Sequence, residues 1–149
     1  MSEIRSSNEV GWALMQEGLS PFALDVDLFQ IVWKGENYLV HTDHLPHVFI
    51  EKRVPLELFE YKREDWIIYF AMDRLNMLRT PVSIFRGDAM DTVTFRSCLF
   101  PSGEESLSHE LVHGMVLIER GIERFGHACE VAVREDNENE IGFFWCNRS

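Results

Sequence analysis

The sequence has no apolar run close to the roughly 20 residues that a membrane-spanning helix requires, and its first nine residues lack the basic and apolar regions of a secretory signal. It contains only three cysteines, Cys98, Cys129 and Cys146, which are widely spaced and form no C-x-x-C pair. Two of them lie among apolar neighbours, which favours small buried side chains over reactive thiols. We therefore expect a cytoplasmic protein without a disulfide framework.

Positive charge is also scarce. The chain has 14 Lys and Arg against 25 Asp and Glu, a net charge of −11 at pH 7. A nucleic-acid backbone would have to bind against this field, so nucleic acid is not an expected partner. The sequence has no glycine-rich phosphate loop and no G-x-S-x-G motif, and Cys98 has no base near it in the sequence to activate it. We expect neither a cofactor nor a membrane partner.

What the chain has in quantity is apolar and aromatic residues. Hydrophobic types make up 46% of its 149 residues, including 11 Phe and four Trp, which is enough for one core of useful size. We expect a single domain, 1–149, with its core over about 8–135. The remaining stretch, 136–149, is an acidic turn followed by an apolar tail, Ile141–Cys146. This tail is expected either to pack on its own domain or to cover a neighbouring subunit.

The spacing of apolar residues predicts the secondary structure. In chain order we expect a helix over Asn8–Glu17, strands over Leu28–Trp33, Tyr38–His41 and His47–Lys52, a helix over Glu64–Leu78, strands over Val82–Arg86 and Thr92–Arg96, and a helix over Ser106–Glu135. Ser7 is the expected N-cap of the first helix and Gly18 its end. The order α-β-β-β-α-β-β-α predicts an α+β domain, an antiparallel sheet with helices packed on one face.

The long final helix contains the most specific motif, His109-Glu110-Leu111-Val112-His113, which matches HExxH. In zinc peptidases two histidines four residues apart bind one Zn²⁺ from the same helix face, and the glutamate activates the metal-bound water. A third ligand is needed, and Glu119 stands where the extended motif has its last one. However, Val116 replaces the glycine of that motif.

The helical wheel favours a simpler interpretation of the same residues. An apolar stripe and a strip of small residues would face the sheet, while the histidines fall on the opposite face beside arginines that repel a dication. The stripe comprises Leu111, Met115, Ile118, Ile122, Phe125 and Cys129, and the small residues are Gly114, Gly121, Ala128 and Ala132. We expect no metal there. A second histidine cluster, His41, Asp43, His44 and His47, has ligand-type side chains but is typical of a polar turn.

Several of these features occur together in one known family. A leading helix ends at Gly18, the hairpin Ile31–Val40 follows, and a helix ends at Arg74-Leu75-Asn76 before the hairpin from Val82 to Phe95 and the long final helix. Over residues 8 to 130 this order resembles the YbjN family of bacterial proteins, which has the fold of type III secretion chaperones of the Tir-chaperone class. The resemblance implies a non-enzymatic, often dimeric, intracellular binding or regulatory module. It carries no catalytic residue.

The function expected from these observations is therefore protein or peptide binding by a homodimeric module without enzymatic activity. The alternative is a small zinc-dependent hydrolase that uses His109, His113 and Glu119 as ligands and Glu110 as base. Aromatic residues on strands and in the tail are the candidates for the binding surface. They are Trp33, Phe49, Phe85, Phe95, Phe144 and Trp145.

Overall fold

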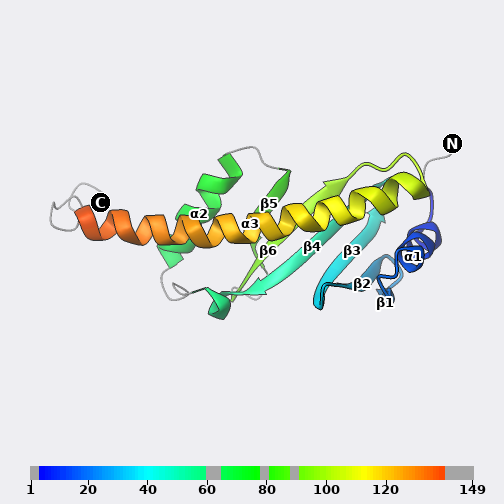
Figure 1. Cartoon of the computed structure of the whole chain (residues 1–149), viewed down its shortest axis with the longest axis horizontal. Coiled ribbons are helices and arrows are strands. Elements are labelled where there is room, and N and C mark those ends of the chain that lie inside the picture. Colours follow the sequence, from blue (N-terminus) through cyan, green and yellow to red (C-terminus); the bar gives the residue numbers. More distant parts are fainter. Residues whose placement is uncertain (1–3, 60–64, 78–80, 88–90, 140–149) are drawn as a thin grey trace.

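The computed structural model describes residues 4–59, 65–77, 81–87 and 91–139 (Figure 1). Within these residues the chain is an α+β domain, as predicted. Its strands are β1 Phe22–Asp25, β2 Leu28–Trp33, β3 Glu36–His44, β4 His47–Pro55, β5 Val82–Arg86 and β6 Thr92–Leu99. The helices are α1 Ser7–Gln16, α2 Asp65–Met77 and α3 Glu104–Asn139, with a short 3-10 helix at Leu56–Leu58.

The strands form one antiparallel sheet in the order β1-β2-β3-β4-β6-β5. β1 is a strand that the sequence pattern does not predict, because its four residues are all exposed and show no alternation of burial. β4 and β6 are longer than predicted, since they pair along their length from Val48 with Leu99 to Pro55 with Thr92. These two long strands form the centre of the half of the sheet that carries the candidate site.

Helix α1 begins one residue before the predicted start. Ser6 is its N-cap and accepts a hydrogen bond from the backbone N–H of Glu9, so the expectation of Ser7 as N-cap is wrong. The Ser7 hydroxyl instead lies 2.7 Å from that of Thr42 on β3. Gly18 ends the helix as predicted, with a φ of +71° that glycine adopts without strain.

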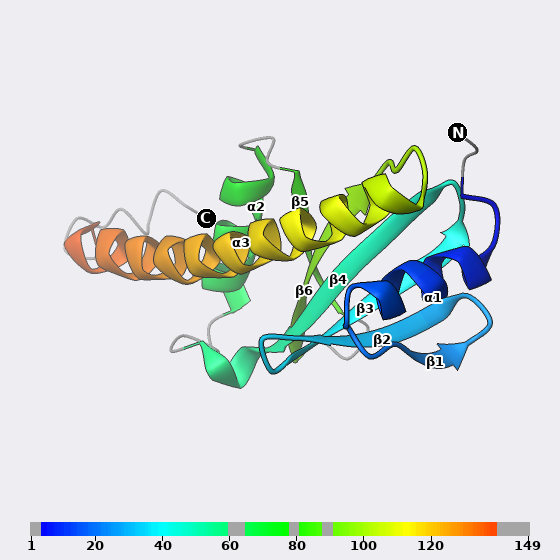
Figure 2. The same ribbon diagram turned by 45° about the vertical axis from the view of Figure 1, so that its right-hand side comes forward.

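The three helices lie on one side of the sheet, and α3 runs over β4, β5 and β6 and continues beyond the sheet beside α2 (Figures 1 and 2). Strand alternation turns one set of side chains toward the helices, and these form the core with the buried sides of α1, α2 and α3. The sheet contributes Ile31, Tyr38, Val40, Val48, Ile50, Val54, Val82, Ile84, Val93, Phe95 and Leu99 to this core.

The surface of α3 agrees with the helical wheel. Of the predicted apolar stripe, all members are buried except Ile122, which is half-buried. The small residues allow close approach: a Cβ added at Gly114 would lie 3.2 Å from Leu99 and 3.3 Å from Ile50, and one at Gly121 would lie 3.4 Å from Val82. The helix is continuous across its glycines because two of them sit where α3 contacts the sheet.

The outer edge of β5 is protected by a side chain from α2. Asn76 Nδ2 donates to the carbonyl of Ile84 at 2.8 Å, and Asn76 Oδ1 accepts from the Ile84 N–H at 3.0 Å. The side-chain amide thus pairs with the backbone N–H and C=O of Ile84 as a neighbouring strand would, and protects this position of the sheet edge. Every helix among the described residues is too short or too polar to span a bilayer.

Candidate functional site

The face of the sheet opposite the helices carries a buried acidic residue. Ile50 and Lys52 of β4 point toward α3, so the intervening Glu51 points to the opposite face. No described helix covers that face, yet Glu51 is only 1% exposed. Its burial must therefore come from neighbouring side chains of the sheet itself.

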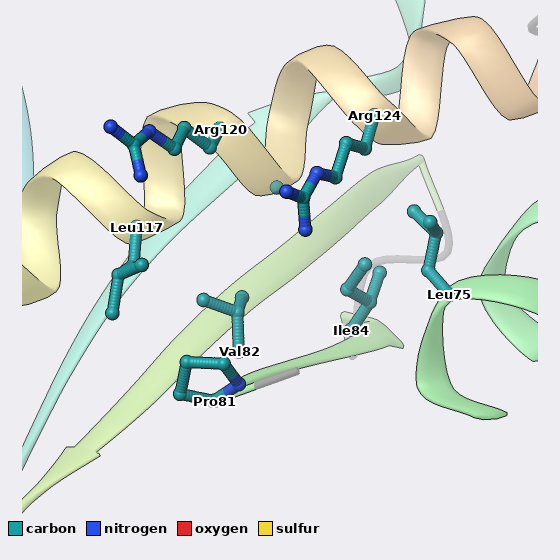
Figure 3. Close-up of a pocket in the computed structure, with 8 residues that line it drawn as sticks. Leu75, Pro81, Val82, Ile84, Leu117, Arg120 and Arg124 are labelled. Atoms are coloured by element: carbon teal, nitrogen blue, oxygen red, sulfur yellow. The ribbon is translucent and has the colours of Figure 1, made fainter. Parts of the chain in front are cut away.

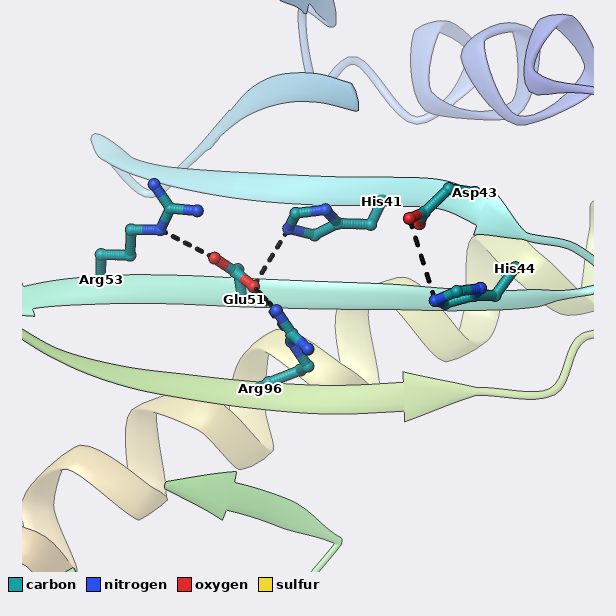
Figure 4. A network of polar contacts seen from close by, with 6 residues as sticks. All are labelled: His41, Asp43, His44, Glu51, Arg53 and Arg96. Carbon is teal, nitrogen blue, oxygen red and sulfur yellow. Dashed lines mark hydrogen bonds and ion pairs between the residues drawn. The ribbon is translucent and has the colours of Figure 1, made fainter. Parts of the chain in front are cut away.

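Three side chains surround the Glu51 carboxylate (Figure 4). Arg96 of β6 donates to Oε1 from Nη2 at 2.6 Å and from Nε at 3.0 Å. His41 of β3 places Nε2 at 3.0 Å from the same oxygen, and Arg53 Nε donates to Oε2 at 2.9 Å. The network therefore joins three neighbouring strands across the middle of the sheet.

These contacts keep Glu51 ionised. Burial alone would raise the pKa of its carboxyl, but the close contacts with His41 and Arg96, together with their charge, outweigh burial and lower that pKa to about 2. The carboxylate is thus a fixed negative charge at neutral pH. It holds two guanidinium groups in defined orientations on an otherwise uncovered surface.

Two aromatic rings complete the site. The Arg96 guanidinium lies 5.0 Å from the ring centroid of Phe85 and 5.6 Å from that of Phe49, both within cation–π range. Phe49 and Phe85 are half-buried. The structure therefore brings together two of the predicted contact residues, Phe49 and Phe85, and places them beside Arg96 and Glu51.

The other selected aromatics lie elsewhere. Phe95 is 0% exposed and packs edge-on against Phe125 of α3, so its prediction as a contact residue is corrected: strand alternation turns it into the core. Trp33 lies on the helix side of the sheet, 6.0 Å from Tyr38, and does not share a face with Phe49. Phe144 and Trp145 lie outside the described residues.

A groove of about 400 Å³ runs beside this network, within the range of ligand sites. Its lining residues are Glu51, Arg53, Phe85, Arg86, Gly87, Thr92, Thr94 and Arg96. Gly87 has a role in its shape, because a Cβ at this position would lie 2.3 Å from Thr92 Oγ1. The absence of that Cβ leaves the threonine hydroxyl open to the groove.

A second pocket, between α2, α3 and β5, is too small for a comparable role (Figure 3). Its volume is about 50 Å³, enough for a few water molecules but well below that of ordinary ligand pockets. Arg124 extends from α3 toward Val82 and Ile84 on its floor. This pocket is a packing gap at the junction of three elements.

The HExxH residues lie on the exposed side of α3. His109 and His113 are both exposed, and Glu110 accepts hydrogen bonds from the Phe100 N–H at 3.1 Å and from the Ser106 hydroxyl at 2.6 Å. The glutamate therefore ties the start of α3 to the end of β6. Across the described ranges no three His, Cys, Asp or Glu side chains form a group suited to a metal ion.

Glu119, the third ligand of the zinc alternative, has other partners. It accepts a hydrogen bond from Tyr38 and another from Lys52 Nζ at 2.9 Å. Burial raises its pKa, but these two bonds outweigh burial and lower it. The pKa of Tyr38 is raised, first by burial and then by this glutamate. Glu119 thus fastens α3 to β3 and β4.

The second histidine cluster does not converge either. His41 binds Glu51, whereas His44 lies 3.8 Å from the exposed Asp43. The His47 ring stacks edge-on with Phe100 at 4.6 Å. Two of these residues border the site on the uncovered face: His41 contacts Glu51, and the His44 ring packs edge-on against Phe49 with 5.5 Å between the ring centroids.

The two cysteines within the described part of the chain differ in burial. Cys129 is buried, and burial together with Glu130 raises its pKa to about 12. Burial also raises the pKa of Cys98, which is half-buried. Both thiols are therefore protonated at neutral pH. Cys146 lies outside the described residues.

Comparison with known proteins supports the fold alone. No family model matches the sequence, and no curated protein is significantly similar to it. The chain is similar in structure to an uncharacterised protein from Methanothermobacter thermautotrophicus, with a TM-score of 0.54 and 8% sequence identity. The match covers 86% of this chain and 99% of that one. At this identity the likeness shows a shared arrangement of helices and strands.

Proposed function

We propose that this chain is a non-enzymatic, cytoplasmic protein-binding module, and that the uncovered face of its sheet holds a segment of a partner protein. The observation that carries the proposal is the buried Glu51, which fixes Arg53 and Arg96 beside Phe49 and Phe85 on a face that no described helix covers.

The network is better suited to orienting side chains than to stabilising the fold. Burying a carboxylate costs hydration energy, and apolar residues in place of a buried ion pair often give equal or greater stability. A charge network on the outer side of a sheet is therefore weak support for a purely structural role. It does supply rigid, preoriented groups, which binding sites require.

The residue types around Glu51 also favour a protein partner. Arginine and aromatic side chains are enriched in protein interfaces and carry much of their binding energy. Two exposed apolar side chains lie farther along the same face, Val32 on β2 and Phe22 on β1. The face thus offers anchoring groups in its centre and apolar surface beside them.

Binding by the face, rather than by addition of a strand, agrees with the state of the β5 edge. A strand added at this edge would compete with Asn76 for the backbone groups of Ile84. The partner segment would instead lie across β4, β6 and β5 and use their side chains. This geometry makes Phe85 and Arg96 central contacts.

The proposal is tested by site-specific photo-crosslinking in an extract of the source organism. A photoreactive residue in place of Phe85 should give one or a few defined crosslinked proteins, identified by mass spectrometry. The same residue in place of Val112, which is exposed on α3, is the matched control. Crosslinks from position 112 but not from position 85 would contradict the proposal.

Homodimerisation is a separate part of the proposal, and light scattering tests it. We expect a dimer whose interface leaves the uncovered face accessible. The Phe49→Ala/Phe85→Ala double variant should therefore keep the oligomeric state of the unmodified chain. Conversion of a dimer to a monomer by this variant would mean that a second copy of the chain covers the face, and would overturn the assignment of the face to another protein.

A further inference from the structure

We propose that the groove beside Glu51 is a carboxylate-binding site, and that the partner segment places an aspartate or glutamate side chain in it. This inference rests on the proposed function, because it names the chemistry of the segment that the uncovered face would hold. It follows from the donors that remain available around Glu51, from the two threonines that line the groove and from the balance of charge.

The arginines of the site have donors to spare. Arg53 uses Nε for Glu51, and Arg96 uses Nε and Nη2. Among the described residues, neither the two Nη atoms of Arg53 nor Nη1 of Arg96 has a hydrogen-bond partner. Guanidinium groups held in this way present paired N–H donors, the arrangement that matches a carboxylate.

A threonine adds a second and independent indication. Thr94 is only 2% exposed and lines the groove. Its hydroxyl has no hydrogen-bond partner within the described ranges, and it is not one of the enclosed side-chain atoms that lack a partner, so it is accessible from the groove. Thr92 places its hydroxyl in the space that Gly87 leaves open. An anion in the groove would give both hydroxyls an acceptor.

The charge balance favours a monoanion. In the network two guanidinium groups, of Arg53 and Arg96, face one carboxylate, and Arg86 is paired with Asp65 at 3.5 Å. The two guanidinium groups therefore exceed the single carboxylate by one positive charge. A carboxylate matches that excess, whereas a phosphate dianion would exceed it in a chain of net charge −11.

The half-buried aromatic rings indicate which residues should neighbour the carboxylate in the partner segment. Phe85 lines the groove beside Arg96, and Phe49 contacts the same guanidinium, so a carboxylate bound in the groove would have apolar surface next to it. A segment with an acidic residue next to an apolar or aromatic one fits this arrangement. A suitable pair of probes is acetyl-Phe-Glu-amide and acetyl-Phe-Gln-amide, which differ only in the charged group.

The experiment is an NMR titration of the full ¹⁵N-labelled chain with each peptide and with inorganic phosphate. We expect the Glu peptide to shift the amide signals of Thr94 and Arg96, and the Gln peptide to bind at least about tenfold more weakly, since a charged hydrogen-bonded group is replaced by a neutral one. Equal binding of the two peptides would overturn the carboxylate site and leave the protein-binding proposal intact.

Two variants locate the effect. Arg53→Gln should weaken binding of the Glu peptide about tenfold or more. The control is Arg124→Gln, which makes the same change in net charge on the other side of the molecule and should leave the affinity for the peptide unchanged. Thr94→Val should weaken binding several-fold without lowering the melting temperature, because the hydroxyl has no partner among the described residues. A lower melting temperature with unchanged affinity would assign Thr94 a structural role and contradict the site.

The remaining outcomes also decide the question. If phosphate shifts the amide signal of Thr94 and binds more tightly than the Glu peptide, the carboxylate assignment is overturned and the groove is a phosphate site. No binding of either peptide would reject the carboxylate site. Crosslinking from position 85 then decides the protein-binding proposal separately, because that experiment does not depend on the chemistry of the groove.

Discussion

Two neighbouring residues of β4, Ile50 and Glu51, are buried almost equally, at 0% and 1% exposure, by entirely different means. Ile50 faces the helices and is covered by apolar side chains that need only fit together. Glu51 faces the opposite side and is covered by His41, Arg53 and Arg96. The covered face holds the fold together through packing, and the uncovered face keeps a few charged groups in fixed positions.

The difference shows where stability and function are separated in this molecule. Removal of an apolar group from the covered face leaves a cavity that the surroundings cannot fill. Except at Glu51, whose carboxylate is itself buried, changes on the uncovered face alter mainly the orientation of side chains that water or a partner can reach. Substitutions on the two faces should therefore differ in the property that they affect.

The largest effect is expected for Phe95→Ala on the covered face. The ring is completely buried against Phe125, so its loss should reduce the free energy of unfolding by about 4 kcal/mol. Phe85→Ala, on the uncovered face of the next strand, should cost only about 1 kcal/mol because the ring is half-buried. Urea unfolding of both variants measures the difference. Equal losses would remove the distinction between the two faces.

The second-largest effect is expected for Glu51→Gln, which should lower the free energy of unfolding by about 3 kcal/mol. This value is at the low end for a broken buried ion pair because Arg53 and Arg96 still reach water. The substitution should also change the acid response. The pKa of Glu51 is lowered in the folded chain. The ionised carboxylate therefore contributes fully to the free energy of unfolding above about pH 4.5, and this contribution is lost as the pH falls toward about 2.

Unfolding curves at several pH values test this second prediction. The stability of the unmodified chain should fall more steeply between pH 4.5 and 2 than that of Glu51→Gln. Parallel curves for the two proteins would mean that Glu51 has an ordinary pKa and that the network does not hold it ionised.

A third pair of variants tests how closely α3 packs on the covered face. Leu in place of Gly114 must displace Leu99 and Ile50, and should cost about 1 to 3 kcal/mol. Leu in place of Gly126, where a Cβ would meet nothing within 4 Å, should raise stability by up to about 1 kcal/mol through helix propensity. Stabilisation by both substitutions, read from thermal unfolding, would mean that α3 is not in close contact with the sheet.

The smallest effect is expected for His113→Ala. The residue is exposed on the far side of α3, so stability should change by less than about 0.5 kcal/mol. Zinc content and melting temperature of the purified chain provide the measurement. Near one zinc per chain that is lost on His113→Ala would revive the hydrolase alternative.

Much of the covered face could be predicted from the sequence. The periodicity of α3 identifies the apolar stripe and the small residues that approach the sheet, and the same wheel places His109 and His113 on the outer side. These predictions succeed because helix geometry converts spacing directly into direction. β1 could not be predicted in this way, since an exposed four-residue edge strand has no apolar pattern.

The site on the uncovered face could be predicted only in part. Phe49 and Phe85 are predictable as aromatic strand residues, but Glu51 and Arg96 are not, because one acidic and one basic residue on separate strands give no local signal. Their contact depends on β6 pairing with β4, a partner more than 40 positions away. The signal that was present was the alternation Phe49, Glu51, Arg53, which places an acidic residue between an aromatic and a basic one on the same face.

The most direct test uses the protein that is crosslinked through the photoreactive residue at position 85. Its affinity is measured for two variants of this chain. Phe49→Ala/Phe85→Ala changes the uncovered face, and Val112→Ala changes exposed α3 surface as a control; both are first shown to be folded by circular dichroism. The account predicts that the double variant binds the partner at least about tenfold more weakly and that the control binds it normally. Normal binding by the double variant, or weaker binding by the control alone, would contradict the assignment of the uncovered face as the binding surface.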